Sequence, residues 1–229
     1  VVLDAPAVDG LRRIHTAGVS GAAEAEFAYR FRTGGWRLAL TARRRPAGIR
    51  AELFHLHALG DGAAHTTVVV NYVITGAPVD RLRFRLPDDL DGVEFVGADV
   101  LRATQPEAGD GLWQVDLRRR VSGDYNLAIA YSRPLDADSP VRIGGIHSLD
   151  ADSQSGFVAI SAGGNRELRP GDTAPLLPIA PDELPTHYRL LVAAPLLGIW
   201  RYADRVPERR VPAVELPGAE PLGALLELA

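Results

Sequence analysis

The sequence predicts an all-β protein, an antiparallel β-sandwich of the meander or Greek-key type with a proline-rich C-terminal extension. Apolar and polar residues alternate along most of the chain, Gly, Pro and Asp clusters separate the alternating segments, and no long segment has helical periodicity. The alternation is clearest in residues 67–86. There Val68, Val70, Tyr72 and Ile74 share one face of an extended chain, so this face is expected to be buried.

Residues 1–23 are mixed in composition and are predicted to form an irregular lead-in to the main β-sandwich, which covers residues 24–167. The sandwich is expected to begin with a hairpin of residues 27–31 and 36–40, because a Gly-Gly pair lies between these two alternating segments.

Two further strands, residues 49–59 and a segment starting at Thr67, are predicted to pair through Gly60-Asp61-Gly62, which supplies the residues of a tight reversal. A Gly-Ala-Pro turn at 76–78 is expected before a strand ending at Leu86. A second turn is expected at residues 121–124. The remaining strands of the sandwich are predicted at 93–101, 111–118, 124–132, 141–146 and 156–161.

The C-terminal part of the chain is rich in proline. Residues 168–185 are predicted to be a linker or an extended crossing segment, and residues 186–229 a small extension that could dock on the sandwich. Within the extension, 187–194 and 197–202 are expected as two final strands, and 222–228 as one or two helical turns.

Composition limits the function classes. A chain of 229 residues with 46% hydrophobic residues can bury a substantial core, and its net charge of −4 argues against an electrostatic nucleic-acid binder. The absence of cysteine excludes disulfides and zinc thiolate sites, and the absence of lysine excludes Schiff-base chemistry. No apolar run approaches the roughly 18 residues that span a bilayer, so no direct membrane insertion by this segment is expected. A chain that starts at Val1 and lacks methionine is expected to be processed or part of a longer protein.

Three histidines form the first candidate metal site. His55 and His57 are two residues apart on a predicted strand and therefore point to one side of the sheet, and His65 of the next strand could supply a third zinc ligand. Because Phe54 and Leu56 occupy the other side, the alternative is that the histidines simply lie on the wetter face.

A second candidate is the pentapeptide Leu-Asp-Ala-Asp-Ser, which occurs at 135–139 and again at 149–153. Its carboxylates could bind calcium, although Ser155 and Ser161 stand where an EF-hand loop counted from Asp150 needs glycine and glutamate. The alternative is two solvated loops, since Asp and Ser stabilise turns. The candidate calcium ligands are Asp136, Asp138, Asp150 and Asp152. No other cofactor is expected.

Other residues have weaker functional interpretations. A dense acidic group could divide acid and base roles in a hydrolase, but acids so close together on a turn more often form a solvated loop; the group is Asp88, Asp89, Asp91 and Glu94. The arginines at 43–45 and 118–120 could bind anions, yet charged strand ends also protect sheet edges. Trp36, Trp113 and Tyr125 would suit sugar stacking, but their aliphatic neighbours favour core positions.

The strand pattern resembles the Ig-like or macroglobulin-like β-sandwich modules of large bacterial envelope or secreted proteins. The resemblance lies in residues 70–72, a Leu-Pro-Asp turn at 86–93, and residues 125–127 with 131–135, and it spans roughly residues 65–161. It implies scaffolding, spacing or protein contact, with no catalytic residues to carry over.

The sequence therefore favours a non-enzymatic structural or protein-interaction module of a larger secreted or envelope-associated protein, with a protein partner or other domains of the same chain as its partner. The first alternative is a carbohydrate-binding module, which would show exposed aromatic rings in a row and could hold a structural calcium. The second is a hydrolase whose carboxylates converge from separate loops. A cytoplasmic location is not excluded by any residue pattern.

Overall fold

The computed structural model describes residues 2–16, 19, 27–43, 46–60, 62–88, 90–106, 109–135, 141–162, 176–204 and 213–216. Its strands confirm the all-β class. The chain divides into two compact units, Val1–Pro46 and Ala47–Ala229, and each unit is described by itself.

The N-terminal unit is a long antiparallel hairpin. Its strands are β1 (Val2–Asp9), β2 (Leu11–Ile14), β3 (Ala28–Phe31) and β4 (Arg37–Arg43). β1 pairs with β4 and β2 pairs with β3. The predicted irregular lead-in and the predicted pairing of 27–31 with 36–40 are therefore wrong. Gly10 has a φ of 69°, so the first arm can bend between β1 and β2 and then continue, while the second arm makes an excursion at 32–36.

The second unit is built around two adjacent strands, β5 (Ala47–Leu59) and β6 (Ala63–Arg85). They pair in antiparallel register from Leu59 and Ala64 onward, and the Gly60 N–H donates to the Ala63 carbonyl at 2.9 Å. Gly62 has a φ of 80°, which an L side chain rarely adopts. The predicted reversal at residues 60–62 is confirmed.

The predicted turns at 76–78 and 121–124 are not reversals. β6 and β9 (Leu112–Pro134) are single strands of 23 residues each, and they remain paired on both sides of these glycine-containing segments. The register shifts where Val79 faces Val121, and both Gly76 and Gly123 have φ of 76°. On one side of this pair residues 75–78 of β6 lie opposite a single residue of β9, and on the other side residues 117–120 of β9 lie opposite a single residue of β6. The two glycine-containing segments therefore lie in or beside bulges of continuous strands, which explains why each resembles a turn in its own sequence.

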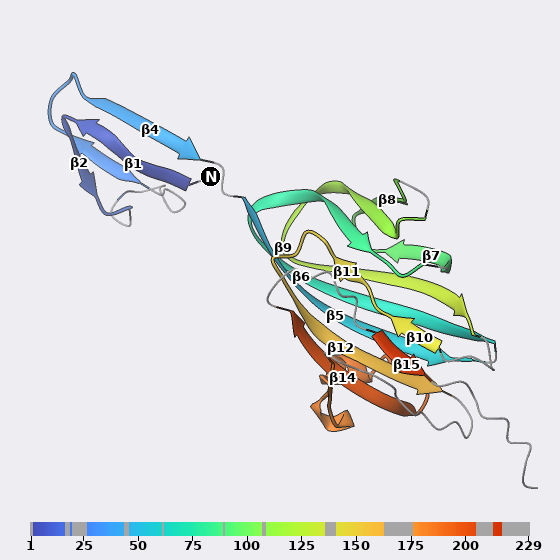
Figure 1. The fold of residues 1–229 in the computed structure, drawn as a ribbon. Coiled ribbons are helices and arrows are strands. Elements are labelled where there is room, and N and C mark those ends of the chain that lie inside the picture. Colours follow the sequence, from blue (N-terminus) through green and yellow to red (C-terminus); the bar gives the residue numbers. More distant parts are fainter. Residues whose placement is uncertain are drawn as a thin grey trace, which may run out of the picture. The chain divides into compact units, whose positions relative to one another are not determined.

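The largest sheet is mixed and has the strand order β13-β14-β12-β5-β6-β9-β7, with β11 on β6 and β8 on β9 (Figure 1). Among the described strands, only β12 and β5 pair in parallel. The strands not yet given are β7 (Asp91–Val96), β8 (Val100–Thr104), β10 (Val141–Gly144), β11 (His147–Ser148), β12 (Ser153–Ala162), β13 (Leu177–Pro178), β14 (Leu196–Asp204) and β15 (Ala213–Leu216). The two-sheet sandwich stays a prediction.

Residues 196–204 of the predicted C-terminal extension are a strand of the main sheet. β14 pairs with β12 along its length, so the predicted strand at 197–202 is confirmed, whereas 187–194 contains a short helix, α1 (Thr186–Arg189), instead of a strand. The linker prediction is tested only from residue 176, where β13 and a 3₁₀ turn at Pro181–Glu183 follow. Residues 163–175 and the predicted turns at 222–228 lie outside the described residues.

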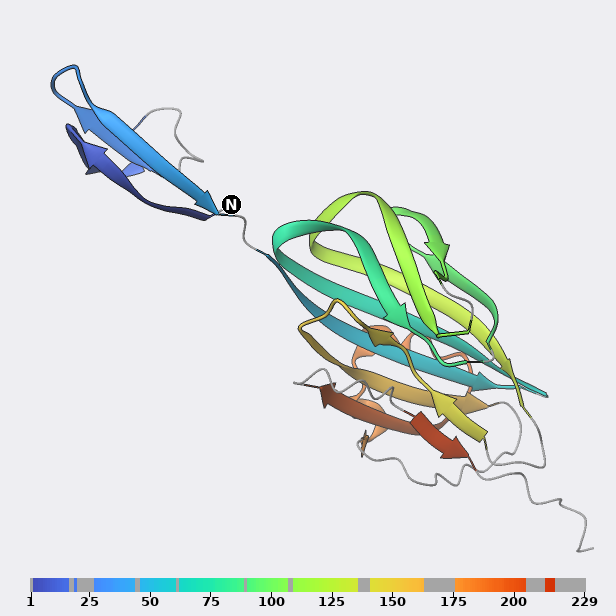
Figure 2. The ribbon, with the colours of Figure 1, turned by 45° about the horizontal axis from the view of Figure 1, so that its top comes forward.

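Buried side chains line both faces of the main sheet. On one face, the alternating residues of β6 and β9 form a core with Leu53 of β5, as the sequence pattern predicts. β10 and β15 lie over the same face beside it (Figure 2), and Ile143 of β10 packs against Val158, Ile160 and Trp200. On the opposite face, α1 packs its Tyr188 against Phe54. The interior strand β5 is therefore covered on both sides.

Candidate functional site

Two buried histidines lie next to each other on β5. His55 and His57 are 0% and 1% exposed, and their rings are nearly parallel with centroids 6.3 Å apart. The prediction that both point to one side of the sheet is confirmed. The alternative that this side is the wetter one is wrong, because segments far away in the sequence cover it.

His55 is held in one tautomer by two backbone groups. Its Nε2 accepts the Ile146 N–H at 2.9 Å, so the ring proton resides on Nδ1, 3.4 Å from the Phe157 carbonyl. Burial lowers the pKa of His55 to about 4, outweighing the opposite effect of these backbone hydrogen bonds. A neutral acceptor therefore lies under residue 146.

His57 starts a chain of hydrogen bonds that runs outward. Its Nδ1 lies 2.8 Å from the Thr66 hydroxyl oxygen, Thr66 bonds the Tyr131 hydroxyl, and Tyr131 donates to the Gly144 carbonyl at 3.3 Å. Because the carbonyl can only accept, each preceding group must pass its own proton forward, so His57 Nδ1 carries the proton and donates to Thr66. Burial, with a smaller contribution from His55, lowers the pKa of His57 to about 3.

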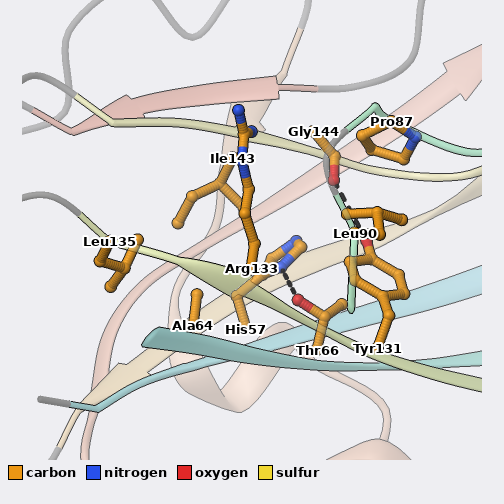
Figure 3. Close-up of a pocket in the computed structure, with 10 residues that line it drawn as sticks. All are labelled: His57, Ala64, Thr66, Pro87, Leu90, Tyr131, Arg133, Leu135, Ile143 and Gly144. Atoms are coloured by element: carbon orange, nitrogen blue, oxygen red, sulfur yellow. Dashed lines mark hydrogen bonds between the residues drawn. The ribbon is translucent and has the colours of Figure 1, made fainter. Parts of the chain in front are cut away.

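A small pocket lies beside this series of hydrogen bonds (Figure 3), and it has room for about one water molecule. Its polar groups come from His57, Thr66, Tyr131 and Arg133, and no described residue that lines it is a carboxylate. The second ring nitrogen of His57 makes no hydrogen bond within the described part of the chain. The pocket can therefore hold a small hydrogen-bond donor such as water, and its described lining contains no pair of acids for hydrolysis.

The segment above the histidines, residues 143–148, is here called the strap. Gln154 binds it at two points, accepting the Ser148 N–H at 2.8 Å and donating to the Ile146 carbonyl at 3.3 Å. The Tyr72 hydroxyl lies 2.8 Å from Ser148 Oγ. The strap is thus held on the sheet mainly by buried side chains of β5, β6, β9 and β12.

The histidines do not converge into the expected metal site. His57 pairs with Thr66, so the neighbouring His65 points to the opposite face of the sheet, where its side chain is exposed. Within the described ranges, no group of three or more His, Cys, Asp or Glu side chains could hold a metal ion.

The aspartates of the second pentapeptide have structural partners. Asp150 accepts hydrogen bonds from the backbone N–H and the guanidinium of Arg83, at 2.7 Å and 2.6 Å for the closest contact of each. Asp152 accepts the Ile49 N–H at 2.8 Å. Both carboxylates therefore fasten the loop after the strap to the main sheet. Asp136 and Asp138 lie outside the described residues, so the calcium site stays a prediction.

A second polar cluster, absent from the sequence predictions, lies on the other face of β5. The fully buried Tyr188 donates its hydroxyl to Glu52 at 2.7 Å and accepts a hydrogen bond from Asn71 at 2.7 Å. Its ring stacks on Phe54 with a centroid distance of 4.5 Å. Burial, reinforced by Glu52, raises the pKa of Tyr188. The signal in the sequence is faint: Glu52 and Asn71 are polar residues that each stand between two apolar neighbours.

The remaining candidates lie on the surface or in the core. Arg119 and Arg120 pair with Asp99 and Asp80 at 2.9 Å and 3.2 Å, so these strand-end charges are used within the fold. The acids Asp88, Asp91 and Glu94 are exposed, while Asp89 lies outside the described residues.

Among the aromatic candidates, Tyr125 is buried and Trp113 is half-buried against Phe95, as predicted, whereas Trp36 is 48% exposed and its core prediction is wrong. Arg44 and Arg45 also lie outside the described residues, as does the side chain of Arg43.

The N-terminal hairpin exposes both apolar and basic side chains. Phe31 is 59% exposed and contacts Trp36, with ring centroids 6.1 Å apart. On the other face of the ladder, Arg12 lies directly opposite Arg30, and neither makes an ion pair with a described residue. No side chain that the structure describes between residues 9 and 46 is buried.

Comparisons with known proteins give little beyond this geometry. No family model and no curated protein matches the chain. Leukotriene A4 hydrolase from Saccharomyces cerevisiae is structurally similar with a TM-score of 0.41 and 12% identity, over 75% of this chain and 29% of the hydrolase. The yeast enzyme in complex with bestatin gives a TM-score of 0.40 and 11% identity, over 74% of this chain and 28% of that one. The chain thus spans less than a third of those structures, and a similarity this low carries no information about its activity. The resemblance to Ig-like or macroglobulin-like modules stays a prediction.

The described part of the chain also contains no helix that is long and apolar enough to cross a membrane.

Proposed function

We propose that this chain is a non-enzymatic protein-interaction module of a larger secreted or envelope-associated bacterial protein, and that its N-terminal hairpin is the docking element. The observation that carries the proposal is the contrast between strand pairing and burial in residues 1–46. The hairpin has well-registered strands, yet its described side chains are exposed or half-buried. A two-stranded hairpin is at best marginally stable in water, so a partner surface must supply the missing burial. The location of the protein rests on the sequence resemblance alone.

Charge indicates the chemistry of the partner. Residues 1–46 contain eight arginines and four acidic residues, for a net charge of +4, whereas residues 47–229 carry a net charge of −8. Arg12 and Arg30 face each other across the ladder, and like charges in this position destabilise a hairpin. A partner protein that covers both faces of the hairpin, with carboxylates over Arg12 and Arg30 and an apolar area over Phe31 and Trp36, would relieve this repulsion and bury the two rings. The acidic remainder of the chain disfavours nucleic acid as the partner.

The alternatives find less support. A sugar-binding platform needs exposed rings in a row, but in the second unit Tyr125 and Trp200 are buried and Trp113 is half-buried. A hydrolase needs two acids across a cleft, and the pocket near His57 has no described carboxylate.

Photo-crosslinking tests the proposal. A photoreactive phenylalanine at position 36, introduced into the full chain in cells that make it, is expected to give one defined protein adduct. The adduct should disappear with Phe31→Ser and persist with Val96→Ser, because Val96 is 62% exposed on β7 of the other unit. A crosslink to nucleic acid, or the absence of any adduct sensitive to Phe31→Ser, would contradict the docking role.

A further inference from the structure

The strap is held by few backbone contacts to the main sheet. β11 pairs with β6 over only two residues, His147 and Ser148, and β10 pairs with β15 rather than with the main sheet. Side chains beneath it, namely His55, Gln154, Tyr131 and Tyr72, add hydrogen bonds. The strap's own Ile143 and Ile146 also pack into the apolar clusters below. Loss of a few side-chain hydrogen bonds can therefore release the strap without breaking the ladders of β5, β6 and β9.

Two of these contacts depend on neutral histidines. His55 can accept the Ile146 N–H only while its Nε2 is unprotonated. His57 lies at the start of the chain that ends on Gly144, and a proton on its free nitrogen would place a second cation in the pocket with Arg133. Protonation at either ring therefore weakens the hold on the strap.

Among the described residues, none that faces the two rings carries a negative charge. His55 faces Tyr202 of β14, His57 and the carbonyl of Phe157 on β12. His57 faces Thr66 of β6, Tyr131 and Arg133 of β9, and Ile143 and Gly144 of β10. Arg133 is the only charged side chain that the described structure places in this set, and its sign is the same as that of an imidazolium.

We propose that residues 143–148 form an acid-sensitive cover, which protonation of His55 and His57 releases while the main sheet remains folded. Release uncovers the apolar face beneath Ile143, which includes Val158, Ile160 and Trp200. Acid thus converts a closed face of the sheet into an apolar surface.

The direction of the effect follows from linkage. Burial lowers the pKa values of His55 and His57 to about 4 and about 3, whereas a histidine in contact with water has an ordinary pKa of about 6.5. The closed state is therefore fully favoured above pH 6.5 and loses its advantage as the pH falls toward 4. At pH 4.5 each histidine favours release by about a hundredfold relative to neutral pH.

Hydrogen–deuterium exchange of the full chain at pH 7.5 and 4.5, corrected for intrinsic exchange rates, tests the proposal. The strap is expected to lose protection at pH 4.5 by more than a hundredfold, while residues 63–74 of β6 remain protected. Loss of protection in strap and β6 together, or unchanged protection in the strap, would overturn the proposal.

Isosteric variants identify the titrating groups. In His55→Gln the amide oxygen can take the place of Nε2, and in His57→Asn the amide can take the place of Nδ1, so both keep their hydrogen bonds without titrating. The double variant is expected to remove most of the pH response, and His65→Gln, which changes an exposed histidine, to retain it. A response unchanged in the double variant would assign it to other groups and contradict the proposal. If the double variant does not fold, the wild-type comparison of strap and β6 still decides.

Discussion

The two units of this chain use the same alternating pattern with different results. In the second unit Leu53, Phe54 and Phe84 are completely buried, because β5 and β6 are interior strands covered from both sides. In the N-terminal hairpin, Phe31 and Trp36 remain exposed, and the described strands of that unit form two-stranded sheets with no covering layer of their own. Alternation therefore indicates which residues share a face of a strand. That face becomes a core only when another strand, sheet or helix packs against it.

The largest difference should come from matched aromatic truncations. Phe54→Ala removes a fully buried ring that stacks on Tyr188, and it should lower the free energy of unfolding by about 3–5 kcal/mol. Phe31→Ala in the hairpin should change it by less than about 0.5 kcal/mol. Urea unfolding followed by circular dichroism measures both. Equal losses would mean that the hairpin shares a core with the rest of the chain.

The two units should also differ in how the free energy of unfolding depends on pH. The free energy of unfolding should fall as pH decreases from 6.5 toward 4, because unfolded histidines take up protons that buried His55 and His57 resist. The expected slope is about 1.4 kcal/mol per pH unit for each of the two. His15→Gln, which changes an exposed hairpin residue, should leave the slope intact. Urea midpoints at pH 7.5, 6 and 5 give the answer, and a flat profile would refute the assignment.

A smaller contrast concerns two tyrosines. Tyr188→Phe removes a hydroxyl that donates to Glu52 and accepts from Asn71, so two part-buried polar groups lose a partner at a cost of about 1–3 kcal/mol. Tyr29→Phe in the hairpin should have no measurable effect, because its side chain is only half-buried. Thermal unfolding of both variants measures the difference. A neutral Tyr188→Phe would show that the polar cluster does not hold α1 on the sheet.

The smallest predicted effect is a change in the stability of the N-terminal hairpin. Arg30→Glu replaces the repulsion across the ladder with an Arg12–carboxylate pair, which should stabilise the hairpin by about 0.2–1 kcal/mol. Amide exchange in residues 11–14 should slow accordingly. Arg32→Glu is the control, because residue 32 lies outside the paired register. Equal slowing in both variants would indicate a general charge effect instead.

The sequence predicts the strands of the second unit well, because each is an alternating run next to turn residues. It fails at residues 76–78 and 121–124, since glycine and proline support a bend within a strand as readily as a reversal. Only the pairing of two distant strands distinguishes these outcomes. It also fails for residues 2–14, which form strands because two segments 14 to 41 residues later pair with them.

The sequence predicts which histidines of the candidate site share a face, but not that this face is buried. Spacing places His55 and His57 on one side of β5, but their burial depends on Ile146, 91 positions later. Glu52 likewise owes its partner to Tyr188, 136 positions later. Local patterns contain no information about such distant partners, so the sequence alone predicts a solvent-exposed face or a metal site for these two buried histidines. Thr66 could have been predicted as the partner of His57, since the two residues lie opposite each other in the β5–β6 pair.

Native-state proteolysis with trypsin tests the central claim most directly, because arginines lie in both units. If the hairpin lacks burial of its own, the isolated chain should be cut at Arg12 and Arg30 long before it is cut at Arg50 or Arg83 in the main sheet. Cleavage of the hairpin no faster than cleavage of the main sheet would show that the hairpin is stable without a partner, and would contradict its role as a docking element.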